Sequence, residues 1–183
     1  MVQNRDIELE VILVLLKNNS HIREIARIIN EPHSSVLRKI RELERENILD
    51  FKEEGRNKVY FLKKTLEAKS HVFKAEHYKL MKILAKYPQL REIIEKIQGN
   101  NKIRIALLFG SYAKGLAKED SDIDLYLDTT NLKLKEEIRN LNSLISVKIG
   151  SYNKSSLLIK EIEKNHVVIK GLEEYYEKNK FFD

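Results

Sequence analysis

The chain of 183 residues has no cysteine, which excludes a disulfide framework and a thiolate metal site. This absence suits a reducing cytoplasm, where we expect the protein to reside. Long apolar runs are absent as well. The run from Val11 to Leu16 is far shorter than the roughly 20 residues of a membrane-spanning helix, and Met1 to Glu10 is too charged for a secretory signal. We therefore expect a cytoplasmic protein that does not enter a membrane.

No segment of the chain is strongly basic. Basic and acidic residues number 13 and 11 over residues 1–65, 7 and 4 over 66–100, and 14 and 13 over 101–183, for a net charge of +6. Net charge alone therefore does not indicate a nucleic-acid partner. Internal repeats are also absent, and a hydrophobic content of 42% leaves room for two small domains or one of ordinary size.

The most informative motif begins where an apolar run, Ile103 to Phe109, ends at Gly110. Such a run predicts a buried strand followed by a tight strand-to-helix turn, where backbone N–H groups and the Ser111 hydroxyl can hold phosphate oxygens. After a polar gap, Asp122 and Asp124 lie two residues apart in a second strand-like run. The period of two places both carboxylates on one face, which suits a divalent metal ion.

Gly-Ser, a polar spacer and Asp-x-Asp in this order resemble the nucleotidyltransferase superfamily of the DNA polymerase beta type, and more narrowly its minimal nucleotidyltransferases. The resemblance implies an α/β (α+β) domain with a small mixed sheet over residues 99–183. It makes Gly110 and Ser111 nucleotide-binding, and Asp122 and Asp124 the catalytic ligands of Mg²⁺ or Mn²⁺. The expected substrate is a nucleoside triphosphate, with ATP favoured. Lys114 flanks the turn and is a further candidate for triphosphate binding.

One position departs from the family pattern, which has a third acidic residue on a later strand. The matching strand here is Leu144 to Gly150, and it places Lys148 where the acid is expected. Asp128 shares a strand face with Asp124 but lies roughly 13 Å along the strand, so we expect it to be a strand-end or turn residue. Two hypotheses stay open. The chain is a nucleotidyltransferase, or it is a regulator whose degenerate transferase domain binds nucleotide or a partner protein without catalysis, and the two need not exclude each other, since a DNA-binding domain can direct a transferase to its target.

The first third of the chain predicts three helices, over Asp6 to Lys17, His21 to Ile29 with Ser20 as N-cap, and Pro32 to Glu46. Strand-like pieces at residues 48–51 and 59–62 follow, around a polar turn at residues 53–57. Three helices and a hairpin resemble the winged helix-turn-helix domain of prokaryotic regulators. We therefore expect a mainly α winged-helix domain over residues 1–65.

This second resemblance makes Pro32 to Glu46 a recognition helix that binds duplex DNA. The candidate DNA-binding residues are His33, Ser34 and Ser35 near the base edges, Arg38, Lys39 and Arg41 at the phosphates, and Arg56 and Lys58 on the wing. The alternative is a protein-interaction module with a solvated charged face. Acidic residues alternate with the bases on this helix, so one copy should bind DNA modestly and a homodimer would help.

Residues 66–98 should form two connecting helices, Leu66 to Lys86 and Gln89 to Ile97, separated by Pro88. The first is either a dimer seam or a helix packed against the transferase domain. In the remaining sequence we expect helices at residues 132–142 and 155–164, a strand at 166–170, and a last helix after Gly171.

Overall fold

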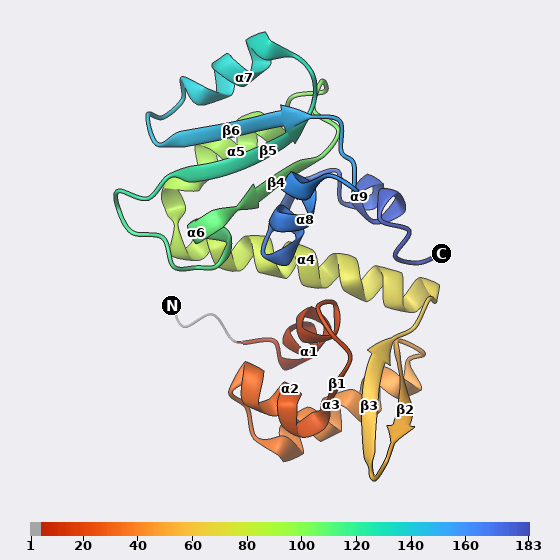
Figure 1. Cartoon of the computed structure of the whole chain (residues 1–183). Coiled ribbons are helices and arrows are strands. Elements are labelled where there is room, and N and C mark those ends of the chain that lie inside the picture. Colours follow the sequence, from red (N-terminus) through yellow and green to blue (C-terminus); the bar gives the residue numbers. More distant parts are fainter. Residues whose placement is uncertain (1–4) are drawn as a thin grey trace. The chain divides into compact units, whose positions relative to one another are not determined.

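The computed structural model describes residues 5–183, which form two compact units (Figure 1). One unit ends at Tyr78 and also includes Phe182 and Asp183, and the other spans Lys79–Phe181. Helix α4 (Leu66–Lys86) begins in the first unit and ends in the second. Within residues 5–183, no helix is both long and apolar enough to cross a membrane.

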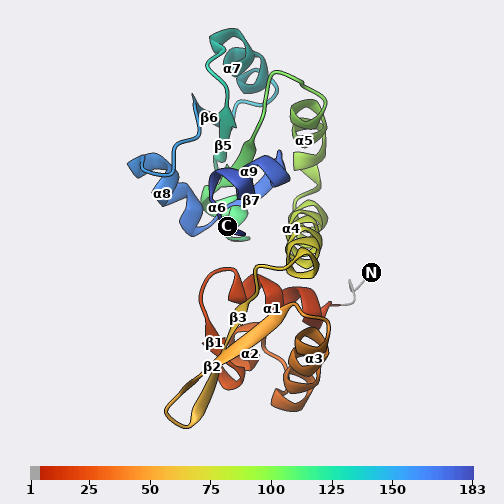
Figure 2. The same cartoon turned by 90° about the vertical axis from the view of Figure 1, so that its right-hand side faces the viewer.

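The first unit contains three helices and a small antiparallel sheet (Figure 2). Its elements are α1 (Ile7–Leu15), β1 (Ser20–His21), α2 (Ile22–Ile29), α3 (His33–Arg45), β2 (Leu49–Glu54) and β3 (Asn57–Leu62). Strand β3 pairs with both β1 and β2, and the hairpin closes through Gly55 and Arg56 alone, because pairing continues to Glu54 and Asn57. This order of elements is that of a winged-helix fold, so the expected fold class is confirmed.

The prediction that Ser20 caps the second helix is wrong. Ser20 lies in β1 opposite Tyr60, and its hydroxyl donates to the carbonyl of Asn18. His21 precedes α2 instead and makes no capping hydrogen bond with its side chain. Strand pairing with a distant segment therefore overrides the local capping preference of serine.

Helix α3 begins at His33, one residue later than predicted. Pro32 occupies the N-cap position with an extended ψ of 138°, so it precedes the first turn of the helix. Val36, Ile40 and Leu43 of this helix are buried, whereas Leu37 is only partly buried.

The second unit contains a four-stranded mixed sheet in the order β6-β5-β4-β7. Strands β5 and β6 are parallel, and the other neighbours are antiparallel. The elements are η1 (Pro88–Leu90), α5 (Arg91–Gln98), β4 (Ala106–Phe109), α6 (Gly110–Ala113), β5 (Ile123–Asp128), α7 (Leu132–Arg139), β6 (Ile145–Gly150), α8 (Leu157–Lys164), β7 (Val167–Lys170) and α9 (Leu172–Lys178). The expected α/β fold with a small mixed sheet is confirmed.

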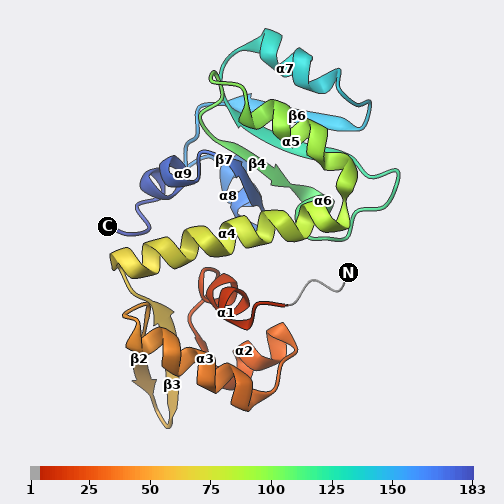
Figure 3. The ribbon, with the colours of Figure 1, turned by 180° about the vertical axis from the view of Figure 1, so that it is seen from behind.

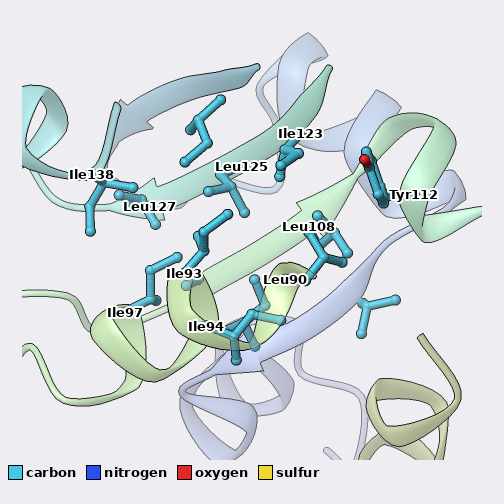
Figure 4. Close-up of a cluster of buried hydrophobic side chains, with 14 of the residues drawn as sticks. Leu90, Ile93, Ile94, Ile97, Leu108, Tyr112, Ile123, Leu125, Leu127 and Ile138 are labelled. Atoms are coloured by element: carbon cyan, nitrogen blue, oxygen red, sulfur yellow. The ribbon is translucent and has the colours of Figure 1, made fainter. Parts of the chain in front are cut away.

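The two faces of this sheet differ in chemistry. Helices α5 and α7 lie over one face (Figure 3), where Ile123, Leu125 and Leu127 of β5 enter a hydrophobic core (Figure 4). The same core includes residues from the end of α4 and from η1, namely Leu80, Ile83, Tyr87 and Leu90. Because side chains alternate along a strand, Asp124, Tyr126 and Asp128 point to the opposite face, the side on which α8 lies (Figure 2). The candidate site is on this second face.

Candidate nucleotide-binding site

The site begins at a turn that joins β4 directly to α6. Phe109 is extended, with φ −137° and ψ −165°, and Gly110 follows with φ 69°. Glycine adopts a positive φ without the steric penalty of a side chain. The chain thus turns sharply into a short helix, as the sequence predicts, and Ser111 lies in its first turn.

The turn contacts one of the two acidic residues. Strand β4 pairs with β5 so that Phe109 lies opposite Asp124. A Cβ atom at Gly110 would lie 2.1 Å from Asp124 Oδ2, so the carboxylate occupies the space that any other residue at position 110 would fill. The predicted phosphate-binding turn and the predicted metal-binding carboxylate are therefore direct neighbours.

Asp122 and Asp124 lie together, as expected from their spacing. Asp122 is exposed just before β5, and Asp124 is half-buried within it. Burial raises the pKa of Asp124, and the negative charge of Asp122 raises it further. A cation bound between the two carboxylates would offset this repulsion.

Strand β6 supplies two more polar side chains to the same face. Its parallel register places Ser146 opposite Asp124 and Lys148 opposite Tyr126. A hydrogen bond between the Ser146 side chain and Asp124 lowers the pKa of Asp124, and the positive charge of Lys148 acts in the same direction. Sequence reasoning missed Ser146, although the period of two from Lys148 would have indicated it.

The acidic pair has no third acidic partner. Within residues 5–183, no group of three or more histidine, aspartate or glutamate side chains could hold a metal ion. In proteins, Mg²⁺ is commonly bound by one or two carboxylates, with phosphate oxygens and water completing its octahedral shell. Asp122 and Asp124 therefore fit one Mg²⁺ whose shell is completed by a nucleotide.

Two residues that sequence reasoning missed hold the segment after the turn. Lys86 Nζ donates to the carbonyl of Gly115 at 2.6 Å, and the Tyr87 hydroxyl donates to the carbonyl of Ala117 at 3.4 Å. The Tyr87 ring also packs edge-on against Tyr112, with centroids 4.8 Å apart. These contacts come from the end of α4 and the residue after it, and no local pattern near the motif predicts them.

Lys114 is exposed after α6, so its ammonium group is available to a ligand. Its charge lowers the pKa of Glu161 on α8, behind the larger effects of Lys164. The candidate lysine thus lies within electrostatic range of α8 as well as beside the turn.

Asp128 is the last residue of β5, as predicted, and its carboxylate is buried among hydrogen-bond donors. It is 1% exposed and accepts hydrogen bonds from the Tyr152 amide at 3.1 Å, Lys178 Nζ at 2.8 Å and Arg104 at 3.4 Å. Its carboxylate is already neutralised by two cations and lies beyond Tyr126 along the strand. Asp128 therefore does not extend the acidic pair.

The candidate DNA-binding residues of α3 differ in availability. His33, Ser34, Arg38 and Arg41 are exposed, and Ser35 is half-buried. Lys39 Nζ lies 2.7 Å from Glu42 Oε2 and 3.7 Å from Glu8 Oε2, and the hydrogen bond to Glu42 raises the pKa of Lys39. Among the residues that the structure describes, Arg38 and Arg41 form no salt bridge, so they are the more available cations of this helix.

The wing candidates are exposed next to the hairpin turn. Arg56 lies in the turn itself, and Lys58 lies in β3 with its Nζ 3.6 Å from the centroid of the Phe51 ring. This contact holds the lysine against the hairpin while its ammonium group keeps access to solvent.

The chain is similar to known proteins in the region of the site. The family described as "Polymerase beta, Nucleotidyltransferase" matches residues 91–175, which include the turn and both aspartates. "Putative protein adenylyltransferase MJ1215" of Methanocaldococcus jannaschii is 33% identical over 77 residues, covering 38% of this chain and 90% of that protein. "Putative protein adenylyltransferase MJ1217" of the same organism is 32% identical over 94 residues, covering 47% of this chain and 90% of that protein.

Among solved structures, the adhesin competence repressor of Streptococcus pyogenes is 17% identical, with a TM-score of 0.41, over 52% of this chain and 75% of that chain. The two archaeal relatives are matched over nearly their whole length, and the family model spans the turn and the acidic pair described above. The chain therefore belongs to the polymerase beta nucleotidyltransferase family.

Proposed function

We propose that the chain is a minimal nucleotidyltransferase that transfers a nucleoside monophosphate from a nucleoside triphosphate to a hydroxyl acceptor. ATP is the nucleoside triphosphate that we favour. The reaction depends on Mg²⁺ or Mn²⁺, and residues 99–183 contain its site. The observation that supports this most directly is the contact between Gly110 and Asp124. A ligand whose phosphates lie on the turn would have a metal-binding carboxylate beside it.

Each residue has a distinct role in this proposal. The backbone N–H groups near Gly110 and the Ser111 hydroxyl bind the outer phosphates, and the exposed Lys114 adds positive charge. Asp122 and Asp124 hold the divalent ion. When bound, this ion neutralises phosphate charge and orients the triphosphate. The half-buried position of Asp124 in a strand fixes its carboxylate relative to the turn.

The transfer itself makes one bond and breaks one. The acceptor oxygen forms a bond to the α-phosphorus, the bond from this phosphorus to the bridging oxygen breaks, and pyrophosphate leaves. The acceptor hydroxyl loses its proton in the same reaction. The residues of this chain contribute mainly by positioning the triphosphate and by charge.

A protein side chain is the acceptor that we favour. Both archaeal relatives bear names that describe protein adenylyltransferases. By this reading, the hydroxyl of a serine, threonine or tyrosine on a target protein receives AMP from ATP.

Incubation of the full chain with α-labelled ATP, Mg²⁺ or Mn²⁺, and a lysate as the source of acceptors tests the activity. We expect label transfer that Asp122→Ala and Asp124→Ala abolish. Asp120→Ala is the matched control, because Asp120 is an exposed acid in the same loop. Transfer that survives both active-site substitutions would reject the proposed roles.

The second candidate function is regulation without catalysis, and Lys148 in place of a third acid favours it. In this case the second unit binds nucleotide or a partner protein, and the winged helix acts on DNA. The same experiment separates the two functions. Nucleotide binding without label transfer to any acceptor would support the regulator.

We also propose that the first unit, with its winged helix over residues 1–65, binds duplex DNA as a homodimer. The exposed side chains on α3 and at the hairpin turn support DNA binding, since they combine polar groups at the start of the helix with cations farther along it and on the wing. They are His33, Ser34, Arg38, Arg41, Arg56 and Lys58. Ser35 and Lys39 are also candidates, although both are only partly exposed.

Gel shifts across a salt series test DNA binding. Replacing both Arg38 and Arg41 with alanine should lower the salt dependence by about two counterions, since each phosphate contact contributes about one. Lys39→Ala should change it less, because Lys39 is paired with Glu42. Failure of the unaltered chain to bind DNA even at low salt would reject this part of the proposal.

A further inference from the structure

Lys148 occupies the site face of the sheet, beside the acidic pair. Strands β5 and β6 run parallel, so Ser146 lies opposite Asp124 and Lys148 is the next residue of β6 on that face. The side chain of Lys148 is exposed, whereas its neighbours Val147 and Ile149 belong to or pack against the core. The register thus places an exposed ammonium group next to a half-buried carboxylate.

Among the described residues, no carboxylate forms a salt bridge with the Lys148 ammonium group. Among residues 5–183, Lys148 forms no salt bridge, although its charge lowers the pKa of Asp124 against the effects of burial and Asp122. Lys178, by contrast, lies 2.8 Å from Asp128 Oδ2 and is fully paired. Lys148 therefore has the charge and the freedom to contact an anionic ligand.

The acidic pair is too small for two divalent ions. Two-ion sites of phosphoryl transfer place the ions about 3.5–4 Å apart, and several carboxylates must share them. Here Asp122 and Asp124 are the two carboxylates beside the turn, since Asp128 on the same face is paired with Arg104 and Lys178, and Lys148 adds an ammonium group next to them. A lysine ammonium is a compact charge with three hydrogen-bond donors, which suits phosphate oxygens.

We propose that Lys148 takes the place of a second divalent cation, so that the site binds a single ion at Asp122 and Asp124 while the Lys148 ammonium contacts the nucleotide phosphates from β6. This inference rests on the proposed nucleotide-binding function. It assigns Lys148 to substrate binding, and it predicts a metal stoichiometry of one per chain.

The first test counts metal ions. Mn²⁺ is titrated into the full chain and followed by electron paramagnetic resonance, in the presence of an ATP analogue with a methylene group between its α and β phosphorus atoms. We expect one bound Mn²⁺ per chain, and two in Lys148→Asp, which adds a third carboxylate. The matched control is Lys133→Met, an exposed lysine on α7, which should bind one.

The second test measures the affinity for ATP without metal, in excess EDTA. The unaltered chain should still bind ATP, and Lys148→Met should weaken this binding about tenfold, as expected for loss of one charge-assisted hydrogen bond. Lys133→Met should bind as the unaltered chain does. Circular dichroism confirms that each variant is folded, which the exposed position of both lysines favours.

The outcomes separate this inference from the proposed function. Two Mn²⁺ ions, or none, in the nucleotide complex of the unaltered chain would overturn the inference, as would equal ATP affinity of Lys148→Met in EDTA. These results leave nucleotide binding itself intact. A folded, unaltered chain that binds no nucleotide with or without metal would overturn the proposed function as well.

Discussion

Asp124 and Asp128 are two aspartates on the same face of the same strand, yet their surroundings are opposite. Asp128 is buried and accepts hydrogen bonds from Lys178, Arg104 and the Tyr152 amide. Asp124 is half-buried against Gly110, and a like charge, Asp122, raises its pKa. The protein compensates the charge of Asp128 through two cations, whereas it compensates that of Asp124 only in part, through Ser146 and Lys148.

The two aspartates show that the partners of a carboxylate decide whether it stabilises the fold or is available to bind a cation. A buried carboxylate with cationic and backbone partners stabilises the fold only as long as the partners stay in place. A carboxylate held near another without a full set of partners costs stability and gains affinity for a cation. Asp128, a paired structural group, therefore lies only four positions along β5 from Asp124, which we propose holds a metal ion.

The largest difference between Asp124 and Asp128 should appear in the activity of their variants. If Asp124 is a metal ligand as proposed, Asp124→Ala should reduce label transfer by about a thousandfold, since its loss removes several kcal/mol of charge stabilisation. It should leave the midpoint of thermal unfolding unchanged or raised. Parallel activity assays and calorimetry check both expectations. A large drop in the unfolding midpoint would mean that Asp124 is structural after all.

Asp128→Asn should have the reverse signature. The amide cannot neutralise Lys178 and Arg104, and we expect the free energy of unfolding to fall by about 2–3 kcal/mol, less than for a fully buried pair because both cations are partly exposed. Urea unfolding monitored by circular dichroism gives this value. Nucleotide affinity should be retained at temperatures where the variant is folded, and its selective loss would contradict the assignment.

Gly110→Ala tests the contact between the turn and Asp124. The new Cβ atom would lie 2.1 Å from Asp124 Oδ2, and the alanine would have to adopt the positive φ of Gly110. We therefore expect nucleotide affinity to fall and the free energy of unfolding to drop by about 1–3 kcal/mol. Gly99→Ala is the control. The φ of Gly99 is −71°, and a Cβ atom there would lie 3.4 Å from the carbonyl oxygen of Glu95, an ordinary contact, so this substitution should change binding and stability little.

The smallest expected effect concerns pH. Because burial and Asp122 raise the pKa of Asp124, the folded state prefers this group protonated, and its contribution to stability is lost as pH rises through the folded-state pKa. Asp124→Asn should therefore be slightly more stable than the unaltered chain at neutral pH. This gain should vanish below the ordinary pKa of aspartate, where both side chains are neutral. Thermal unfolding midpoints from pH 3 to pH 7, a range of about four units that brackets this pKa, measure the crossover.

Sequence reasoning succeeded where the signal is local. The spacing of Gly110, Asp122 and Asp124 predicted a turn and two neighbouring carboxylates, because a strand period and a glycine turn need only a few adjacent residues. Lys148 was singled out by the family pattern, which has an acidic residue at this position, and the register of β6 brings it to the same face. Helix α4 was also predicted with the bounds that the structure has.

The rest depends on partners that are distant along the chain. Ser20 became a strand residue because Tyr60 pairs with it, and Lys39 of α3 gains a second acidic neighbour, Glu8, because α1 lies beside α3. The pairing of Asp128 with Lys178 and the support of the turn by Lys86 likewise join remote segments. No periodicity or capping rule reports such contacts, since they arise only when the elements pack.

The core of the second unit also sets the limits of any excised fragment. Leu80, Ile83, Tyr87 and Leu90 precede the family match at residue 91, yet they belong to the same core as Leu108 and Leu125 of the sheet. A fragment cut at residue 91 would expose that apolar surface to water and lose the hold of Tyr87 on the segment after the turn. A fragment that keeps this core intact should therefore start near Lys79, where the compact unit itself begins.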